Sequence, residues 1–226
     1  VLSIKDPNLE GYLFMATKNG IVKKTPLSEF KNLRKNGLIA LNLRDEDELL
    51  KVKLTFGDAK IIIVTQDGYA IKFSEKDVRP MGRTASGVKA ISLRKNDIAV
   101  CMDIATDDEE LLVISENGFG KRTPLTEYKT QNRGGVGLIT YKVAEKTGKL
   151  VGASVCKKDD EMMLINTSGV AIRINVADIS ITSRSAMGVT LMRTLGEEKV
   201  VAVAKISSAD SSEKNEILQE VVVESI

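Results

Sequence analysis

Basic side chains recur at fixed places along this chain. Four of them stand four residues after a glycine that ends a turn, and four more stand shortly before a second glycine. The first set is Lys24, Lys72, Arg122 and Arg173, and the second is Arg34, Arg83, Arg133 and Arg184. Basic and acidic residues are almost equal in number, 33 against 31. An ordinary solvent-exposed face would therefore carry acidic as well as basic residues at these eight positions, and not bases alone. Such an array could neutralise the phosphates of duplex DNA without reading its bases.

Further bases and glycines adjoin these eight positions. The stretch QNRGGVG, residues 131–137, places two glycines directly after an arginine. Glycines allow backbone N–H groups to approach phosphate oxygens, and a glycine that needs a positive φ would not tolerate a branched side chain; Gly135 is our candidate for such a position. We predict DNA contacts by Lys23, Lys24, Arg34, Lys35, Lys72, Arg83, Lys121, Arg122, Arg133, Gly134, Gly135, Arg173 and Arg184. We expect these charges to be exposed, so that replacing Lys121 and Arg122 by Ala would leave the fold intact.

The elements that hold these residues form an internal repeat. Turn glycines preceded by Asn, Asp or Ser stand at positions 20, 68, 118 and 169, which are 48, 50 and 51 residues apart. Strand-like apolar segments precede each turn, and further ones follow each second glycine. Two such segments joined by Asn-Gly or Asp-Gly predict a β-hairpin with a type I′ turn, which has positive φ at both central residues. Helical periodicity is weak, and we expect Pro26 and Pro124 to mark entry into loops.

Each repeat therefore offers about four short strands in roughly fifty residues, the size of one blade in a radial β architecture. We predict an all-β domain over residues 1–206, with four blades of four antiparallel strands at about 11–58, 59–108, 109–160 and 161–206. The first residues, VLSI, resemble the last strand of a further repeat, so we expect the chain to be cut from a longer one. We also expect an exposed blade edge, which invites pairing between copies or cover by a terminus.

The composition argues against catalysis and against a metal site. The chain has no histidine, which excludes an imidazole base and histidine-based metal binding. The acidic clusters at 45–48, 107–110 and 159–161 lie between strand-like segments, and we interpret them as solvated turns. Cys101 and Cys156 lie in apolar segments without a C-x-x-C partner, which predicts inert buried thiols in a reducing cytosol. We therefore predict no catalytic residue, no metal and no cofactor.

The charge distribution and the aromatic residues bear on the kind of partner. The last twenty residues, 207–226, contain five acids and one lysine, a charge of −4, so the remaining body carries +6. We predict that this acidic tail is disordered and that it could compete with DNA for the same bases.

Only nine aromatic residues are present and none is Trp, which argues against a stacking platform for single strands. No long uncharged apolar segment predicts a membrane span.

Four motifs carry a resemblance to a known family, and together they span nearly the whole body. They are MATKNGIVKKTPLSEF, GYAIKFSEKDVRPMGRTASGV, NGFGKRTPLTEY and DISITSRSAMGVTLMRT. In this order they resemble successive repeats of the family formed by the C-terminal domain of the DNA gyrase A protein. The corresponding domain of topoisomerase IV is the near alternative. The resemblance implies a β-pinwheel, in which neighbouring blades exchange strands and an outer basic surface wraps duplex DNA.

The same resemblance implies a place in a larger enzyme. The holoenzyme introduces negative supercoils using ATP, and the domain would work beside the ATPase subunit of the enzyme, in the cytoplasm and at the nucleoid. The breakage-reunion domain of the same polypeptide would be its other partner. The family's seven-residue box, a glutamine followed by basic residues and glycines, lies in a blade that this sequence lacks. Residues 131–137 resemble that box without its second and sixth bases, and they are either a second DNA contact or a loop that kept its glycines. A propeller-like scaffold that binds an acidic protein is the alternative function.

Overall fold

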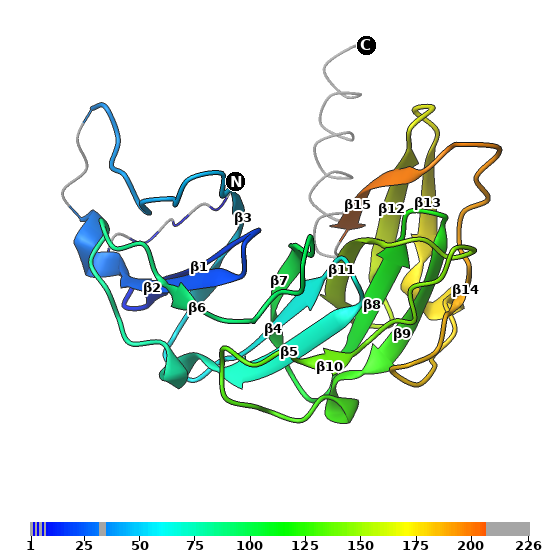
Figure 1. The fold of residues 1–226 in the computed structure, drawn as a ribbon. Coiled ribbons are helices and arrows are strands. Elements are labelled where there is room, and N and C mark those ends of the chain that lie inside the picture. The colour runs from blue at the N-terminus through cyan, green and yellow to red at the C-terminus, as the bar shows by residue number, and fades with distance from the viewer. Residues whose placement is uncertain (1, 3, 5, 7, 32–34, 207–226) are drawn as a thin grey trace, which may run out of the picture.

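The strands of this protein form four antiparallel sheets arranged along an arc (Figure 1). The computed structural model describes residues 8–31 and 35–206, together with residues 2, 4 and 6. The predicted acidic tail, residues 207–226, and Arg34 lie outside the described residues. None of the described elements is a helix long and apolar enough to cross a membrane.

Each sheet takes most of its strands from one repeat. The first sheet has the order β3 (Leu49–Thr55), β1 (Tyr12–Thr17), β2 (Ile21–Pro26), β6 (Val88–Lys89). The second has the order β10 (Leu138–Ile139), β5 (Tyr69–Ser74), β4 (Lys60–Thr65), β7 (Ala99–Ala105). The third has the order β11 (Leu150–Cys156), β8 (Glu110–Ser115), β9 (Phe119–Pro124), β14 (Val189–Thr190). The fourth has the order β13 (Ala171–Asn175), β12 (Glu161–Asn166), β15 (Val200–Ile206).

Neighbouring repeats exchange strands. The two-residue strand β6 belongs to the second repeat but pairs with β2 of the first, with Lys89 opposite Ile21. In the same way β10 pairs with β5 and β14 pairs with β9. We call the loops that carry these short strands, and the corresponding loop of the first repeat, described over residues 35–48, the exchange loops. This exchange confirms the all-β pinwheel that the sequence resemblance implies, although the fourth sheet has three strands within the described residues rather than the expected four. The predicted repeat boundaries stay a prediction.

The hairpin turns form where they are expected, but their type differs from the prediction. In each of the four, the turn glycine donates its N–H to the residue three positions earlier, as in Gly20 N to Thr17 O at 3.0 Å. Only the glycine has positive φ, +73° at Gly20, while the residue before it does not. The expected type I′ turn is therefore wrong. A type I turn followed by a left-handed glycine, the usual three-residue hairpin, fits these angles.

Short 3-10 turns follow the outer hairpin strands. They are η1 (Leu27–Phe30), η2 (Glu75–Asp77), η3 (Leu125–Glu127) and η4 (Val176–Asp178). Pro26 and Pro124 directly precede two of them, which suits a residue with fixed φ and no N–H to donate. The turns η2, η3 and η4 carry the chain from a hairpin into the exchange loop that pairs with the preceding sheet.

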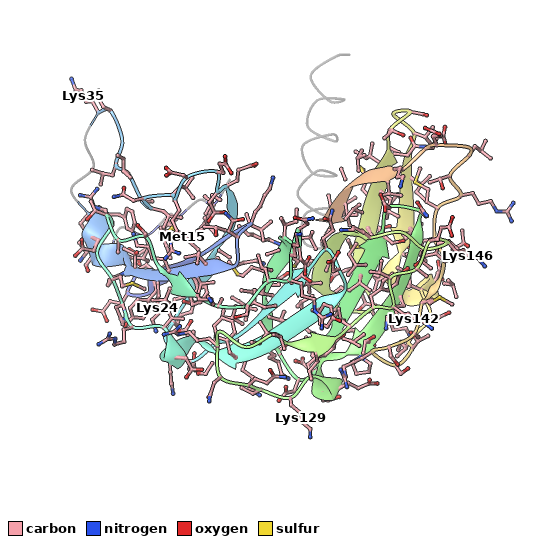
Figure 2. The ribbon with its side chains drawn as sticks, viewed as in Figure 1. Met15, Lys24, Lys35, Lys129, Lys142 and Lys146 are labelled. Carbon is pink, nitrogen blue, oxygen red and sulfur yellow. The ribbon has the colours of Figure 1, made fainter. Side chains whose placement is uncertain are left out.

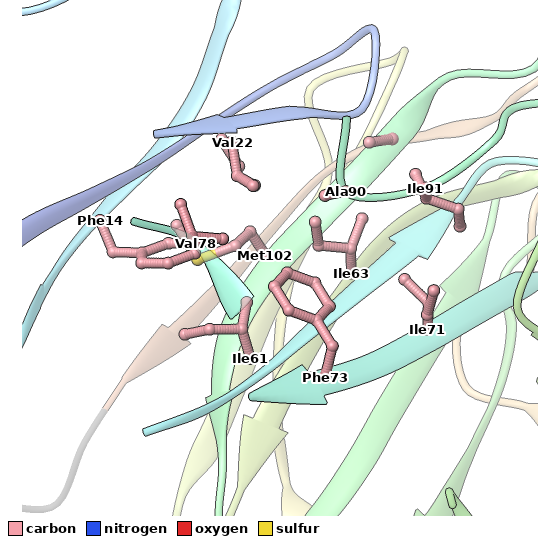
Figure 3. Close-up of a cluster of buried hydrophobic side chains, with 12 residues drawn as sticks. Phe14, Val22, Ile61, Ile63, Ile71, Phe73, Val78, Ala90, Ile91 and Met102 are labelled. Carbon is pink, nitrogen blue, oxygen red and sulfur yellow. The ribbon is translucent and has the colours of Figure 1, made fainter. Parts of the chain in front are cut away.

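The hydrophobic cores lie between neighbouring sheets. Figure 3 shows the first, in which Phe14 and Val22 of the first sheet pack against Ile61, Ile63 and Phe73 of the second. Corresponding clusters fill the spaces between the second and third sheets and between the third and fourth. Because each face is covered only when the next repeat folds against it, the repeats stabilise one another in sequence.

The two cysteines belong to these cores. Cys101 and Cys156 are both free and buried, and burial raises the pKa of each thiol to about 12. A thiol with so high a pKa is a poor nucleophile and a poor metal ligand at neutral pH. The prediction of inert buried thiols is confirmed in this respect.

Candidate nucleic-acid interface

Three of the four bases that stand four residues after a turn glycine lie between the blades. Lys24 Nζ donates to Glu75 O at 3.0 Å and Lys72 Nζ donates to Leu125 O at 2.8 Å. Arg122 extends the pattern, with Nε 2.8 Å from Ile179 O. All three side chains are buried, and every acceptor lies in or beside the 3-10 turn of the following repeat. They bind one blade to the next.

Two further predicted bases are fully buried. Lys23 Nζ donates to Ala40 O at 2.8 Å and to Arg83 O. Lys121 Nζ donates to the carbonyl oxygens of Ser183 and Arg184, each at 2.5 Å. Both ammonium groups therefore bond to the exchange loop that covers their strand. A charge without water needs such partners, because the free-energy cost of desolvating it is otherwise not offset.

The expectation that these five bases are exposed is wrong. Strand alternation places a polar side chain on the outer face of a hairpin, and the sequence predicts that this face meets water. Lys23 and Lys24 are adjacent and point to opposite faces of β2, as Lys121 and Arg122 do in β9. In the structure both faces are covered by the next repeat, one by its 3-10 turn and the other by its exchange loop. Lys23 meets Arg83, 60 residues along the chain, and Lys121 meets Arg184, 63 residues along. Their DNA contacts stay a prediction, but the proposed DNA path does not depend on them.

The buried ammonium of Lys121 should make stability depend on pH in the alkaline range. Burial lowers the pKa of Lys121 to about 8, the charge of Arg184 acts in the same direction, and Glu127 opposes them. An unfolded lysine keeps its ordinary pKa near 10.5, so between about pH 8 and 10.5 the unfolded chain binds more protons than the folded one. The free energy of unfolding should therefore rise with pH across that interval through this residue.

Urea unfolding at pH 7.5 to 10 would measure this contribution as the difference in slope between the native chain and Lys121→Met. The native chain should gain stability relative to the variant as the pH rises. Parallel profiles for the two proteins would show that Lys121 titrates normally.

The bases near the second glycines are half-buried and contact the preceding exchange loop. Arg83 Nη1 donates to Ile39 O at 3.3 Å, and Arg184 Nη1 donates to Ile139 O at 3.0 Å. Arg133 reaches Asp77 O and Lys89 O, each at 2.9 Å. A guanidinium has five N–H donors, so each of these side chains keeps donors for a phosphate. Lys35 and Arg173 are exposed.

The glycine-rich loop at 131–137 is built into the interface between the second and third repeats. Gly134 N donates to Ala90 O at 2.6 Å, and Ser92 N donates to Gly135 O at 2.8 Å. Positive φ occurs at Gly134, +86°, and at Gly137, +77°, but not at Gly135. The expected strain at Gly135 is therefore wrong, since a Cβ there would meet nothing closer than 3.7 Å. The N–H of Gly134, which was expected to face a phosphate, donates to Ala90 O instead. A DNA contact by this loop stays a prediction.

The acidic clusters do more than the solvated turns that the sequence predicts. Asp107 pairs with Lys60 at 2.9 Å and with the buried Lys72 at 3.4 Å. Glu110 pairs with the buried Arg122 at 2.6 Å. These acids balance the charge of the inter-blade bases. In the part of the chain that the structure describes, no group of three potential metal ligands comes together.

A second row of bases, which the sequence reasoning missed, is exposed at one offset from the turn glycines in three repeats. Lys31, Arg79 and Lys129 stand eleven residues after the turn glycines of the first three repeats, and all three are exposed. Each comes at or just after the end of its 3-10 turn. Figure 2 shows Lys129 pointing away from the convex side, whereas Lys24 lies within the fold. Counting the same offset in every repeat would have found this outer row, which ends at Ser180 in the fourth.

Comparison with known proteins gives the same family for the whole body. The model of the family "DNA gyrase C-terminal domain, beta-propeller" matches residues 11–55, 59–100, 109–157 and 160–207. The A subunit of DNA gyrase from Clostridium acetobutylicum is 59% identical over 213 residues, which are 94% of this chain and 26% of that protein. Its counterpart from Staphylococcus epidermidis is 44% identical over 94% of this chain and 24% of its own. This chain thus spans about a quarter of the length of these relatives.

Two solved structures are also similar. The C-terminal domain of DNA topoisomerase IV superposes with a TM-score of 0.89 at 30% identity, over 97% of this chain and 69% of that one. A DNA gyrase A C-terminal domain superposes with a TM-score of 0.80 at 29% identity, over 90% of this chain and 68% of that one. Four matched repeats, strand exchange between the sheets and 59% identity to a gyrase protein lead to one conclusion: the chain belongs to the DNA gyrase A C-terminal domain family.

Proposed function

We propose that this protein binds duplex DNA along the convex side of its arc, without sequence preference. The observation that carries the proposal is the outer row, Lys31, Arg79 and Lys129, which places one exposed base at the same position of three successive blades. Bases repeated along a curved edge can follow the phosphates of a bent duplex and release its counterions. Arg83, Arg133 and Arg184 lie in the neighbouring exchange loops and can add contacts.

Duplex DNA fits this surface better than a single strand. Of the nine aromatic residues, Phe14, Phe73, Tyr128 and Tyr141 are buried, so they cannot stack on bases. Phe56 is exposed and lines one hollow with Lys31 of the outer row, but one ring does not make the series of stacking rings that a single-strand site needs. Binding would therefore be electrostatic and tolerant of sequence.

The proposal extends to the larger enzyme. We infer that the domain is not catalytic itself and wraps DNA for a gyrase holoenzyme that introduces negative supercoils using ATP. Its partners would be the breakage-reunion domain of the same polypeptide and the ATPase subunit of the enzyme, in the bacterial cytoplasm at the nucleoid. The two sequence relatives from Clostridium and Staphylococcus are both gyrase proteins, which supports gyrase over topoisomerase IV.

Removing the outer row should weaken DNA binding and flatten its salt dependence. In a variant with Lys31, Arg79 and Lys129 replaced by Ala, we expect affinity for a random-sequence duplex to fall about tenfold or more at low salt. The slope of log affinity against log salt should decrease by about 0.9 for each lost phosphate contact, or roughly 2 to 3 in all. Fluorescence anisotropy across a salt series would give both values, and the losses should be the same for duplexes of different sequence.

A matched control removes the same charge elsewhere. Arg44, Lys157 and Lys158 are exposed and lie in other turns, so their triple replacement by Ala should leave most of the salt slope in place. Equal effects in the two triple variants would contradict the outer row as the DNA path. No DNA affinity in the native chain, with binding to an acidic protein instead, would favour the scaffold alternative.

A further inference from the structure

A hollow of about 510 Å³ lies between the exchange loops of the third and fourth repeats. One part of its lining is the segment 136–139, which contains β10, and another part is the segment 183–185. Tyr69, Arg94 and Glu127 complete the lining. We call it the inter-loop hollow. Its volume is typical of small-molecule sites in proteins, which measure roughly 300 to 1,000 Å³.

The inter-loop hollow involves neither end of the chain. Both loops that flank it are among the described residues. Each exchange loop in this fold contacts the one before it, as Arg133 contacts Lys89 and Arg184 contacts Ile139. By the same pattern, the loop of any further repeat would meet the fourth loop at Thr190, a described residue that does not line the hollow.

The two loops that flank the hollow lack a contact that joins the preceding pair. Between the second and third exchange loops, Gly134 N donates to Ala90 O at 2.6 Å. The equivalent residues of the third and fourth loops are Ser185 and Thr140, and these two described residues form no backbone hydrogen bond with each other. The third and fourth loops therefore stand apart at the point where the second and third loops are joined.

A cation–π pair forms one part of the hollow. The guanidinium carbon of Arg94 lies 4.0 Å from the centre of the Tyr69 ring. Arg94 is exposed, so the face of its guanidinium that points away from Tyr69 is open to a second flat ring. A guanidinium stacks on aromatic rings by its face and donates its N–H groups at its edge. Arg94 can therefore hold a ring and an anionic group at the same time.

Arg184 presents hydrogen-bond donors from the fourth exchange loop. Its Nη1 donates to Ile139 O at 3.0 Å, and its backbone N–H donates to Glu127 Oε2 at 3.2 Å. These bonds fix the position of the guanidinium, and its remaining N–H groups suit the paired oxygens of a phosphate. Ser183 and Ser185, on either side of it in the sequence, also line the hollow and add hydroxyl donors.

The segment 136–139 gives the hollow an apolar surface. Val136 and Ile139 have 57% and 47% of their area exposed, although both side chains are apolar. Exposed apolar surface beside a few convergent polar groups is the usual composition of a small-molecule site. A flat organic ring would cover this surface, whereas an inorganic anion would leave it exposed to water.

We propose that the inter-loop hollow binds a small ligand in which a flat ring carries a phosphate, and a mononucleotide is the chemical class that matches. The ring stacks on Arg94 and covers the segment 136–139. The phosphate accepts N–H groups from Arg184 and a hydroxyl group from the same loop. The second carboxylate oxygen of Glu127 accepts an amino group of the ring. The outer row takes no part, so the proposal does not rest on the proposed DNA binding.

Adenosine monophosphate (AMP) is the probe, because it has one phosphate and an amino group on its ring. Amide chemical shifts of the isotope-labelled chain, followed during a titration without DNA, give the affinity and show whether 136–139 and 183–185 respond. AMP should bind at least about tenfold more tightly than inorganic phosphate or adenosine, since each of these makes only part of the contacts. Arg94→Ala and Arg184→Ala should each weaken AMP binding by about tenfold or more.

Matched variants separate the hollow from the general positive charge of the chain. Arg44 stands seven residues after the second glycine of its repeat, as Arg94 does, but Ile21 takes the place of Tyr69 there. Arg44→Ala should therefore bind AMP like the native chain. Tyr69→Ile copies the first repeat, removes the ring beneath Arg94 and should weaken AMP binding. The variant without the outer row should also bind AMP normally, and far-UV circular dichroism shows whether each variant folds.

A native chain that binds no AMP at millimolar concentrations would overturn the proposal. Inorganic phosphate or adenosine that binds as tightly as AMP would do so too, because the hollow would then recognise only one part of the ligand. Equal losses in Arg44→Ala and Arg94→Ala would show that AMP follows the overall charge of the chain and not the hollow.

Discussion

Lys121→Ala is expected to lower the free energy of unfolding by about 2 to 5 kcal/mol. The substitution removes a fully buried ammonium group that donates to Ser183 O and Arg184 O. It leaves two carbonyl oxygens without a donor and a cavity where the side chain packed, and each of these effects is destabilising. The sequence alone predicts the opposite result, because it assigns Lys121 to an exposed surface.

The control is another lysine of the same repeat. Lys129 is exposed, so Lys129→Ala should change the free energy of unfolding by less than about 0.5 kcal/mol. Urea unfolding followed by far-UV circular dichroism measures both variants. Lys121→Met keeps most of the packed volume, so comparing it with Lys121→Ala separates the cavity from the lost hydrogen bonds. Equal stability of the Lys121→Ala and Lys129→Ala proteins would contradict the structural role of the buried ammonium.

Gly118→Ala is expected to be far more destabilising than Gly169→Ala, although the two glycines end equivalent turns. Their φ angles are +75° and +79°, so both variants incur the cost of about 1 to 2 kcal/mol of an alanine in the left-handed region. At Gly118 the new Cβ would also lie 2.0 Å from Met192 O. This backbone must shift, which should cost roughly a further 1 to 3 kcal/mol.

The same unfolding measurement checks this pair. The exchange loop crosses Gly118, whereas no atom of the described residues lies within 4 Å of a Cβ built on Gly169. The difference in stability between the two variants therefore measures the effect of that cover. Equal losses in the two proteins would mean either that the exchange loop at Gly118 yields easily or that Gly169 is covered in solution.

Much of the fold could be predicted from the sequence, because its signals are local. Turn glycines about fifty residues apart, with strand-like segments on either side, are sufficient to predict four antiparallel hairpin units. A tight turn and an alternating strand depend on the residues that form them. The positive φ at Gly20, Gly68, Gly118 and Gly169 confirms the positions of those turns. The turn type was not predictable from Asn-Gly alone, since a type I turn with a left-handed glycine accommodates the same pair.

The sequence predicts that the site is positively charged, but it does not predict which bases are exposed to a ligand. The repeat marks several positions as basic, but whether a base meets water or a carbonyl depends on what packs over it. Lys24 and Arg173 have the same offset from their turn glycines, yet Lys24 is buried beneath η2 and Arg173 is exposed. The outer row could also have been found from its constant offset from the turn glycines. Nothing in the sequence, however, shows that these bases are exposed while the bases nearer the glycines are buried.

By itself, the sequence determined the repeat, the all-β class, the hairpin positions and the family, because each of these follows from local pattern or from similarity along the chain. The tertiary structure decided which bases bind one blade to the next and which are exposed to solvent. The physical reason is strand exchange: the cover of each hairpin comes from a segment about 60 residues away, and desolvation depends on that cover. The types and spacing of the residues in one hairpin do not show which distant segment will cover it.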